Sequence, residues 1–400
     1  MRHARARLAE LCLPTRAVCL RGWERGMNHT TIAKVACVGI LGLTVGCSSG
    51  QRAAAPAAPY KLGTFEAGGK TFVGVVVDDA LVADIAEANG AFERDNASAP
   101  KLAMPGDMKA LIERYGELRE RLGLMAGAMK ATPRPGWARE LTALKTRPPI
   151  TSPTTMLNAA VNYAEHAAEM ARVGGETRSA PSTTAPASPS MPGLWERKAG
   201  DTRNNPYFFL KPPAVVIANG EAIQLPPGRE KIDWECELAV VVGKTATRVP
   251  VDRAAEYIFG YTLENDVSDR GGRGDGRHGS DWLIGKGHDT FAPLGPFIVP
   301  REFVKDPQKL ALKFTLSGKV MQDSNTDRMT HTAVEMVSFG SHILTLRVGD
   351  VLALGSPAGV GTARATPIYF KPGDTAVCTI ESIGTLTNPV VATPTSPATH

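Results

Sequence analysis

The chain has 400 residues, of which 43% are hydrophobic and 21% are charged, and its formal net charge is +5. These values are typical of a soluble globular protein that is long enough for one large domain and one smaller domain. The basic residues form no stripe with interleaved aromatic residues, so we expect no nucleic-acid partner.

The first 47 residues contain two different segments. Residues 27–47 combine a short cationic start that ends at Lys34, an uncharged apolar core and a small residue before Cys47. This order is typical of a secretory signal peptide, and it resembles a bacterial lipoprotein signal that would leave lipid on Cys47. The apolar run is too short for a transmembrane helix. We therefore expect a periplasmic or membrane-anchored protein, with a cytoplasmic enzyme as the alternative, and interpret residues 1–26 as an extension from a misplaced start codon.

Residues 48–59 are rich in alanine and proline, which predicts a linker. Only two cysteines, Cys236 and Cys378, follow this linker. Each of them fits the alternation of a strand, so we expect small buried hydrophobic residues rather than a disulfide.

Residues 60–148 indicate a small α/β N-terminal domain without a chemical motif of its own. Strand-like runs flank the turn Ala67-Gly68-Gly69. Apolar residues recur at helical spacing between Met108 and Met129, and Asp107 is suited to cap that helix.

The first candidate catalytic residues lie in an alanine-rich, helix-prone segment, 158–170. His166 and Glu169 are three residues apart and therefore neighbours on one helical face. A histidine that is oriented by a carboxylate can take a proton from water, although a pair of this kind is also common on protein surfaces. Residues 174–205, rich in Ser, Thr and Pro, predict a mobile loop that is either a lid over the site or a tolerated insertion.

A strand is predicted over residues 232–243, where Asp233, Glu235 and Glu237 alternate and so share one face. Three crowded carboxylates repel one another, and a bound Mg²⁺, Mn²⁺ or Ca²⁺ would turn that repulsion into attraction. Asp266, at the end of a later strand, could supply a third oxygen ligand. The alternative is a solvated acidic strand face.

Further candidates follow in glycine-rich surroundings. Arg270 and Arg273 lie in or beside a Gly/Arg loop over residues 271–279, which suits an anionic substrate or is merely solvated. Lys286 stands between two glycines, and the segment from Gly355 and Ser356 to Gly361 could bring backbone N–H groups close to an anion. A helix is expected from 332 to 344, and a disordered tail over residues 392–400.

Taken together, residues 150–391 resemble the catalytic C-terminal domain of the fumarylacetoacetate hydrolase family. The ordered motifs that carry this resemblance are Asn162-Tyr163-x-x-His166-x-x-Glu169, Phe209-Leu210-Lys211-Pro212, Asp233-Trp234-Glu235-Cys236-Glu237-Leu238, Gly260-Tyr261-Thr262-x-x-Asn265-Asp266-Val267-Ser268, Gly285-Lys286-x-x-Asp289-Thr290-Phe291 and Gly355-Ser356-Pro357-x-Gly359-Val360-Gly361.

The resemblance implies an α+β fold, with a mixed β-roll or β-sandwich, flanking helices and the small N-terminal domain, assembled as a homodimer. It places Mg²⁺, Mn²⁺ or Ca²⁺ on Glu235, Glu237 and Asp266, while Asp233 orients a neighbour. His166 with Glu169 would activate water or move a proton. Lys286 would stabilise an oxyanion. The substrate would be held by the residues Tyr163, Arg270, Arg273, Gly355 and Ser356.

We therefore expect a metal-dependent hydrolase that cleaves a C–C bond in an acylpyruvate-like or diketo acid. An isomerase, tautomerase or decarboxylase of 2-oxo acids is the alternative within the same chemistry. A lipid-anchored binding protein without catalysis is the alternative of another class, although a binder has little use for a base such as His166. The chain departs from compact members of the family at Arg273, where glutamine is usual, and at Ser356, where threonine is commoner.

Overall fold

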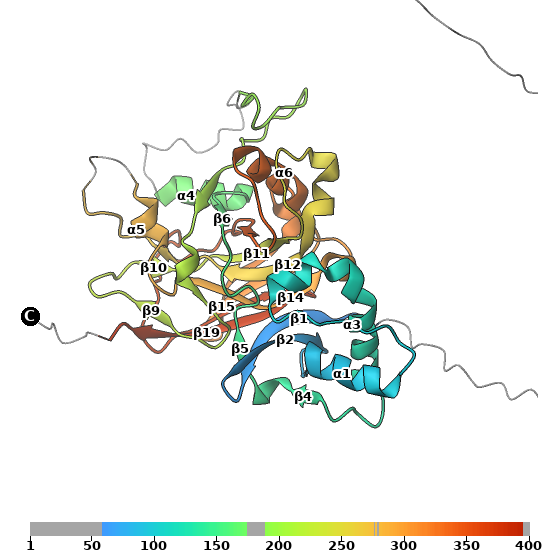
Figure 1. Ribbon diagram of the computed structural model, residues 1–400. Helices are drawn as coiled ribbons and strands as arrows, with labels where there is room; N and C mark the ends of the chain where they lie inside the picture. The colour runs from blue at the N-terminus through green and yellow to red at the C-terminus, as the bar shows by residue number, and fades with distance from the viewer. Residues whose placement is uncertain (1–57, 174–188, 276, 278–279, 395–400) are drawn as a thin grey trace, which may run out of the picture. The chain divides into compact units, whose positions relative to one another are not determined.

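The computed structural model describes residues 58–173, 189–275, 277 and 280–394, and Figure 1 shows how their helices and strands are arranged. The largest sheet has the strand order β4-β3-β2-β1-β14-β12-β11-β17-β6-β7, with β5 beside β1 and β8 beside β14. Its strands are β1 (Lys61–Ala67), β2 (Lys70–Val77), β3 (Leu81–Asp84), β4 (Ala138–Glu140), β5 (Lys145–Arg147), β6 (Met156–Ala159), β7 (Phe208–Leu210), β8 (Val216–Ile217), β11 (Cys236–Val242), β12 (Ile258–Asn265), β14 (Ala292–Pro300) and β17 (Val351–Ala353).

Two smaller sheets, six α-helices and five short 3₁₀ helices complete the secondary structure of the described residues. The second sheet has the order β16-β15-β18-β19-β9, and β10 pairs with β13 alone. These strands are β9 (Ile223–Leu225), β10 (Ile232–Asp233), β13 (Ser268–Asp269), β15 (Ala311–Leu316), β16 (Lys319–Asn325), β18 (Thr375–Ile380) and β19 (Gly384–Ala392). The helices are α1 (Ile85–Asp95), α2 (Met108–Glu113), α3 (Tyr115–Met129), α4 (Ala164–Val173), α5 (Trp282–Lys286) and α6 (Ala333–Ile343). Mixed sheets with flanking helices confirm the expected α+β class.

The predicted hairpin at the start of the described residues is confirmed. Strands β1 and β2 pair antiparallel up to Ala67 and Lys70, so only two residues form the turn. Both of these, Gly68 and Gly69, have positive φ, which is the reason why a tight turn of this kind needs glycine.

One helix was expected over 108–129, and the structure forms two. The Asp107 side chain caps the first as predicted, by accepting a hydrogen bond from the Ala110 N–H. The helix ends at Glu113, because the next residue, Arg114, has a ψ of 8° that departs from helical geometry, and α3 begins at Tyr115. The apolar spacing continues across this break because both helices pack on the same core, which includes Leu111 and Leu118.

The N-terminal strands join the larger part of the chain through β1, which pairs with β14, and β14 in turn pairs with β12. One apolar core includes Leu62 of β1, Ile298 of β14 and Phe259 of β12. The boundaries of 60–148 and 150–391 stay a prediction.

The strand expected over 232–243 is interrupted at Trp234 and Glu235, but its two faces are as predicted. Trp234 stacks on Phe314, with ring centroids 5.2 Å apart, on the apolar side. The structure corrects the expectation for the cysteines, since Cys236 and Cys378 form a disulfide with Cα atoms 5.6 Å apart. Alternation predicts that both side chains are buried but does not show that β11 and β18 face each other.

The segment 158–170 is only partly helical. Residues 156–159 form the strand β6, which lies between β17 and β7 in the sheet, and helix α4 begins at Ala164. Alanine content overestimated the helix here because pairing within the sheet decides the conformation of this stretch. The helix expected over 332–344 is confirmed as α6, with a capping box formed by Thr332 and Glu335.

Residues 189–205 are more fixed than the expected mobile loop. Trp195 is buried and packs edge-on against His331 and Phe339, and Arg203 forms an ion pair with Glu335 at the start of α6. Residues 174–188, on which the lid prediction rests, lie outside the described residues, as do 395–400 of the predicted tail. Among the described helices, none has the length and apolar character that a membrane span requires.

Candidate active site

Two neighbouring strands bring the predicted carboxylates together. Strands β11 and β12 pair antiparallel with Cys236 opposite Asn265. Just beyond this pair, the Asp266 N–H donates to the Glu235 carbonyl oxygen at 2.8 Å, and the Asn265 side-chain oxygen accepts from the Glu235 N–H at 3.1 Å. Residues 235 and 266 are therefore held side by side, and the alternation of β11 adds Glu237 on the same face.

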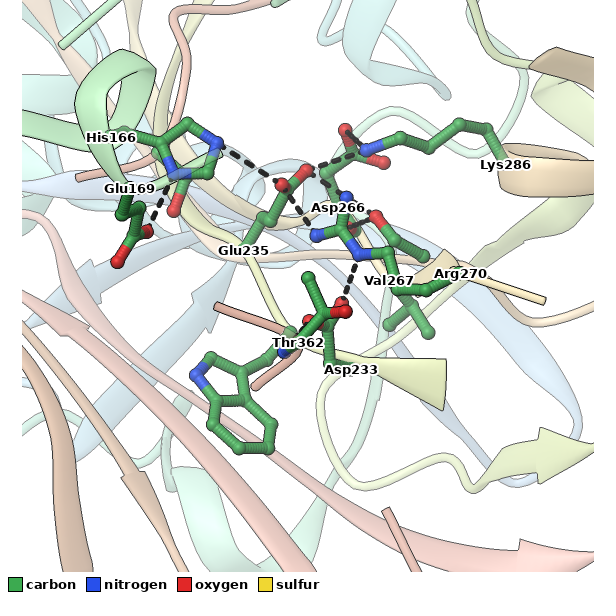
Figure 2. A network of polar contacts seen from close by, with 12 residues as sticks. His166, Glu169, Asp233, Glu235, Asp266, Val267, Arg270, Lys286 and Thr362 are labelled. Carbon is green, nitrogen blue, oxygen red and sulfur yellow. Dashed lines mark hydrogen bonds and ion pairs between the residues drawn. The ribbon is translucent and has the colours of Figure 1, made fainter. Parts of the chain in front are cut away.

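Glu235, Glu237 and Asp266 form a compact, buried group of oxygens. One carboxylate oxygen from each residue lies within 4.8 Å of the others. Two lysines approach this group from other segments. Lys286 of α5 donates to Glu235 at 2.5 Å and to Asp266 at 2.6 Å, and the fully buried Lys211 also donates to Asp266. Figure 2 shows the Lys286 ammonium directed at both carboxylates.

Positive charge is distributed unevenly over the three carboxylates. Burial alone would raise the pKa of Glu235, but Arg270 and Lys286 outweigh this effect and hold its pKa well below the usual value. The pKa of Glu237 is raised well above its usual value, first by burial and then by the charges of Asp266 and Glu235. Within the described residues, its Oε2 accepts one hydrogen bond, from the Gly355 N–H at 2.7 Å.

The uneven charge around the three carboxylates is relevant to whether they can bind a divalent cation. Three buried carboxylates with a deficit of positive charge at Glu237 form an all-oxygen ligand set, which is the set that Mg²⁺, Mn²⁺ and Ca²⁺ prefer. The residues therefore fit the metal that the sequence predicted.

Asp233 lies beside this group and contacts a different partner. Its carboxylate accepts from the Arg270 guanidinium at 2.7 Å and from the Thr362 N–H at 2.8 Å. The same guanidinium donates to Glu235 at 2.7 Å, so Arg270 bridges the two carboxylates (Figure 2). Asp233 thus orients Arg270, as expected from the sequence.

Helix α4 carries His166 and Glu169, and both side chains are buried beside the carboxylate group. The imidazole Nδ1 lies 2.8 Å from Glu169, whose two oxygens also accept from the Gly359 N–H at 3.1 and 2.9 Å. The Nε2 atom faces Glu235 at 3.5 Å. Because Glu169 accepts the Nδ1 proton, Nε2 is left with the lone pair that a base requires. Burial would lower the pKa of His166, but Glu169 and Glu235 outweigh it and raise this pKa.

A cavity of about 90 Å³ lies where these groups meet. Half of its lining is polar or charged, namely His166, Glu235, Glu237, Arg270, Lys286 and Ser356. The other half is apolar and consists of Ala159, Ala160, Val161, Met170, Phe209 and Trp282. The site can therefore hold a small anion against cations and a base while covering the rest of that molecule with apolar surface.

Three of the predicted substrate contacts lie elsewhere. Tyr163 is fully buried and does not line the cavity, and Gly355 supports Glu237 through its backbone. Arg273 lines an adjoining surface pocket of about 500 Å³, which shares Met170, Arg270, Trp282 and Lys286 with the cavity. It lies 3.4 Å from Asp275, its neighbour in the same loop. Arg270 and Ser356 do line the cavity.

Sequence reasoning gave no role to two buried residues of the site. Lys211 stands in the motif Phe209-Leu210-Lys211-Pro212, but the sequence does not show that its side chain is buried against Asp266. Gln322 of β16 donates to the Ser356 hydroxyl at 2.7 Å and accepts from the Cys236 N–H at 3.2 Å. It links the glycine-rich segment to Cys236, which lies between Glu235 and Glu237, and a one-dimensional pattern does not reveal this contact.

Comparison with known proteins gives consistent results. Residues 155–391 match the family described as fumarylacetoacetate (FAA) hydrolase C-terminal. A mitochondrial oxaloacetate tautomerase from Bos taurus is 34% identical over 243 residues, which is 61% of this chain and 68% of that protein. A 5-carboxymethyl-2-hydroxymuconate delta-isomerase from Mycobacterium smegmatis is structurally similar with 29% identity and a TM-score of 0.56, over 84% of this chain and 99% of that one. A maleylpyruvate hydrolase from Sphingobium sp. SYK-6, solved with manganese(II) and pyruvate, has 28% identity and a TM-score of 0.58, over 83% and 99% of the two chains.

The expected periplasmic or membrane-anchored location is wrong by this comparison. The Bos taurus and Rattus norvegicus relatives are mitochondrial proteins by name, not periplasmic or lipid-anchored ones. The signal-like segment 27–47 lies outside the described residues, so the prediction rested on a short apolar pattern alone. The match over residues 155–391, together with the identity to the tautomerase, shows that the chain belongs to the fumarylacetoacetate hydrolase family.

Proposed function

We propose that the protein is a metal-dependent tautomerase that interconverts the keto and enol forms of a short 2-oxo acid. The observation that carries this proposal is the position of His166, whose Nδ1 is held by Glu169 at 2.8 Å and whose Nε2 lies 3.5 Å from Glu235 in a cavity of about 90 Å³. A base beside a carboxylate cluster in so small a space suits proton transfer within a compact acid.

The chemistry follows from the positions of the side chains. A divalent cation on Glu235, Glu237 and Asp266 would supply a Lewis acid for the oxygens of the substrate. His166 Nε2 removes a proton from C3, the electron pair of that C–H bond forms the C2–C3 double bond, and the carbonyl oxygen takes the negative charge. Transfer of this proton from the His166 imidazolium to the oxygen gives the enol and restores the neutral base, and the reverse steps restore the ketone.

The remaining polar residues hold the substrate in this scheme. Lys286 carries positive charge beside the carboxylate group, and burial, which would lower its pKa, is outweighed by Asp266 and Glu235, so that its pKa is raised and the ammonium is retained. This charge stabilises a developing enolate. Ser356 and Arg270 line the same cavity and are suited to the substrate carboxylate.

A C–C bond hydrolase is the second candidate. The relative solved with manganese(II) and pyruvate is a maleylpyruvate hydrolase, and a His–Glu pair can equally activate water. Hydrolysis needs room for both an attacking water and a longer acyl group, so it would need the adjoining pocket of about 500 Å³ in addition to the small cavity. Homodimer formation stays a prediction from the family.

The decisive experiment measures proton exchange at C3. The full chain, loaded with Mn²⁺ or Mg²⁺, is added to oxaloacetate in D₂O, and the loss of the C3 proton signal and the enol absorbance are followed. Maleylpyruvate cleavage is measured in parallel. We expect rapid exchange that is abolished by EDTA and restored by either ion. Cleavage of maleylpyruvate without exchange of oxaloacetate would overturn the proposal in favour of the hydrolase.

A further inference from the structure

Val161 has an unusual backbone conformation at the edge of the active-site cavity. Its φ is +51°, in the left-handed region that β-branched residues rarely adopt because their side chain collides with the backbone. Glycine, asparagine and aspartate adopt this conformation far more easily. The side chain is 44% exposed and also lines the cavity, which places it at the cavity mouth.

The neighbouring residues force this conformation on Val161. On its N-terminal side, β6 pairs with β7, and the Ala160 N–H donates to the Tyr207 carbonyl oxygen at 3.0 Å. On its C-terminal side, the Asn162 side chain donates to the carbonyl oxygens of His331 and Leu354 at 3.0 and 2.8 Å and accepts from the His331 N–H at 2.8 Å. The chain is therefore fixed on both sides, and residue 161 must turn between the two anchors.

The turn itself does not require a valine. Thr290 is the other β-branched residue with positive φ in the described chain, and its hydroxyl accepts a hydrogen bond from the Gln224 N–H at 2.8 Å. Val161, in contrast, has no polar side-chain atom that could form such a hydrogen bond. Its two methyl groups occupy space at the cavity mouth. Glycine would satisfy the same turn with less strain and a wider opening.

We propose that Val161 determines substrate specificity by limiting the length of the 2-oxo acid that the cavity accepts. In this arrangement the carboxylate and carbonyl end of the substrate binds among the polar residues of the lining, and the carbon chain beyond C3 lies against its apolar residues, with Val161 at the cavity mouth. This inference rests on the proposed function, and it adds that short acids are selected against longer ones by steric exclusion.

Binding separates this inference from the catalytic proposal. The full chain with Mn²⁺ is titrated calorimetrically with pyruvate and with 2-oxooctanoate, which share one head group and differ in chain length. We expect the wild-type protein to bind pyruvate more tightly, and we expect Val161→Ala and Val161→Gly to shift the ratio of the two dissociation constants toward the longer acid by roughly 10-fold or more.

Arg248→Gly provides the matched control for strain. Arg248 also has positive φ, of +50°, but it is exposed and does not line the cavity. Both glycine variants should raise the melting temperature or leave it unchanged, and only Val161→Gly should alter the ratio of dissociation constants. An unchanged ratio in folded Val161→Ala and Val161→Gly would overturn the specificity role. Failure of the wild-type protein to bind either acid would instead refute the proposed function on which the inference rests.

Discussion

Charged side chains are placed in opposite ways in two regions of this protein. In residues 60–148, ion pairs such as Lys130–Asp78 and Arg134–Glu140 lie on the surface around an apolar core. In the active site, Lys211 and Asp266 form an ion pair with no exposed side-chain surface, next to Lys286 and Glu235. Surface pairs contribute little to stability, and buried charges often reduce it.

The difference indicates what each region contributes. The N-terminal strands and helices stabilise the fold by burying apolar surface. The buried charges of the active site contribute little to stability, so we attribute them to activity. Substitutions in the active site should therefore lower activity more than stability, and substitutions in the N-terminal core should do the reverse.

His166→Ala should have the largest effect. Loss of the base is expected to lower the rate of C3 proton exchange by about 10²–10⁴-fold, which is the usual contribution of general acid–base catalysis. The melting temperature should change little, because the cluster around Glu235 keeps Lys286 and Arg270 as partners. Exchange rates followed by NMR, together with thermal unfolding, check both expectations.

The matched control is His342→Ala on α6, which removes an imidazole that does not line the cavity and whose Nδ1 bonds to the Ser338 carbonyl oxygen of the same helix at 2.8 Å. This variant should retain wild-type exchange. If His166→Ala kept full activity, the assignment of the base would be refuted.

Leu111→Ala should show the reverse pattern in the N-terminal region. Leu111 is fully buried in the core formed by α2, α3 and the strands β1 to β3. Removing its side chain is expected to cost about 2–5 kcal/mol of unfolding free energy, through lost burial and the cavity left behind. The exchange rate of the protein that remains folded should stay close to wild type. Urea unfolding measures the first quantity, and a large loss of activity below the unfolding transition would contradict the separation of the two regions.

Gln322→Met tests a residue that contacts the site without lining the cavity. Gln322 holds Ser356 and the Cys236 N–H, so we interpret it as a positioning residue for the substrate carboxylate. Its loss should change catalytic efficiency by about 10–100-fold, as for other residues that orient ligands, and raise KM more than it lowers kcat.

Asn388→Leu is a suitable control for this variant. Asn388 is a buried amide that donates to the carbonyl oxygens of Ala218 and Glu221, both at 2.8 Å, away from the cavity. This substitution should reduce stability by about 1–3 kcal/mol, because two buried acceptors lose their donor, without altering KM. Equal effects of the two variants on KM would show that Gln322 acts only on stability.

The residue types of the site were predictable from the sequence to a greater extent than their contacts. Alternation around Glu235 and helical spacing between His166 and Glu169 are local patterns, and the fold preserves local patterns when one face is buried. The disulfide between Cys236 and Cys378 depends on which strands face each other across 142 residues, and no local pattern contains that information. The conformation of Val161 was also hidden, because it results from anchors on both sides rather than from its own preference.

The smallest predicted effect concerns the buried imidazole of His331, where burial outweighs the nearby carboxylates Glu335 and Asp201. The pKa of His331 is lowered below its usual value of 6.5, mainly by burial. Its Nε2 donates to the Asn204 carbonyl oxygen at 2.7 Å, while the buried Nδ1 has no hydrogen-bond partner within the described residues. Protonation would place a charge on that buried nitrogen, so the folded state keeps the ring neutral.

The sign of the pH dependence follows from this shift. Below pH 6.5 the unfolded chain binds a proton at His331 that the folded protein excludes, so its contribution to stability is complete above 6.5 and is lost as pH falls through the lower folded pKa. His331→Gln can still donate to Asn204 but does not titrate. The melting temperature of the variant should therefore fall less than that of the wild-type protein between pH 7.5 and pH 5. Parallel curves for the two proteins would show that His331 is protonated equally in the folded and unfolded states, and that burial at this position does not exclude charge.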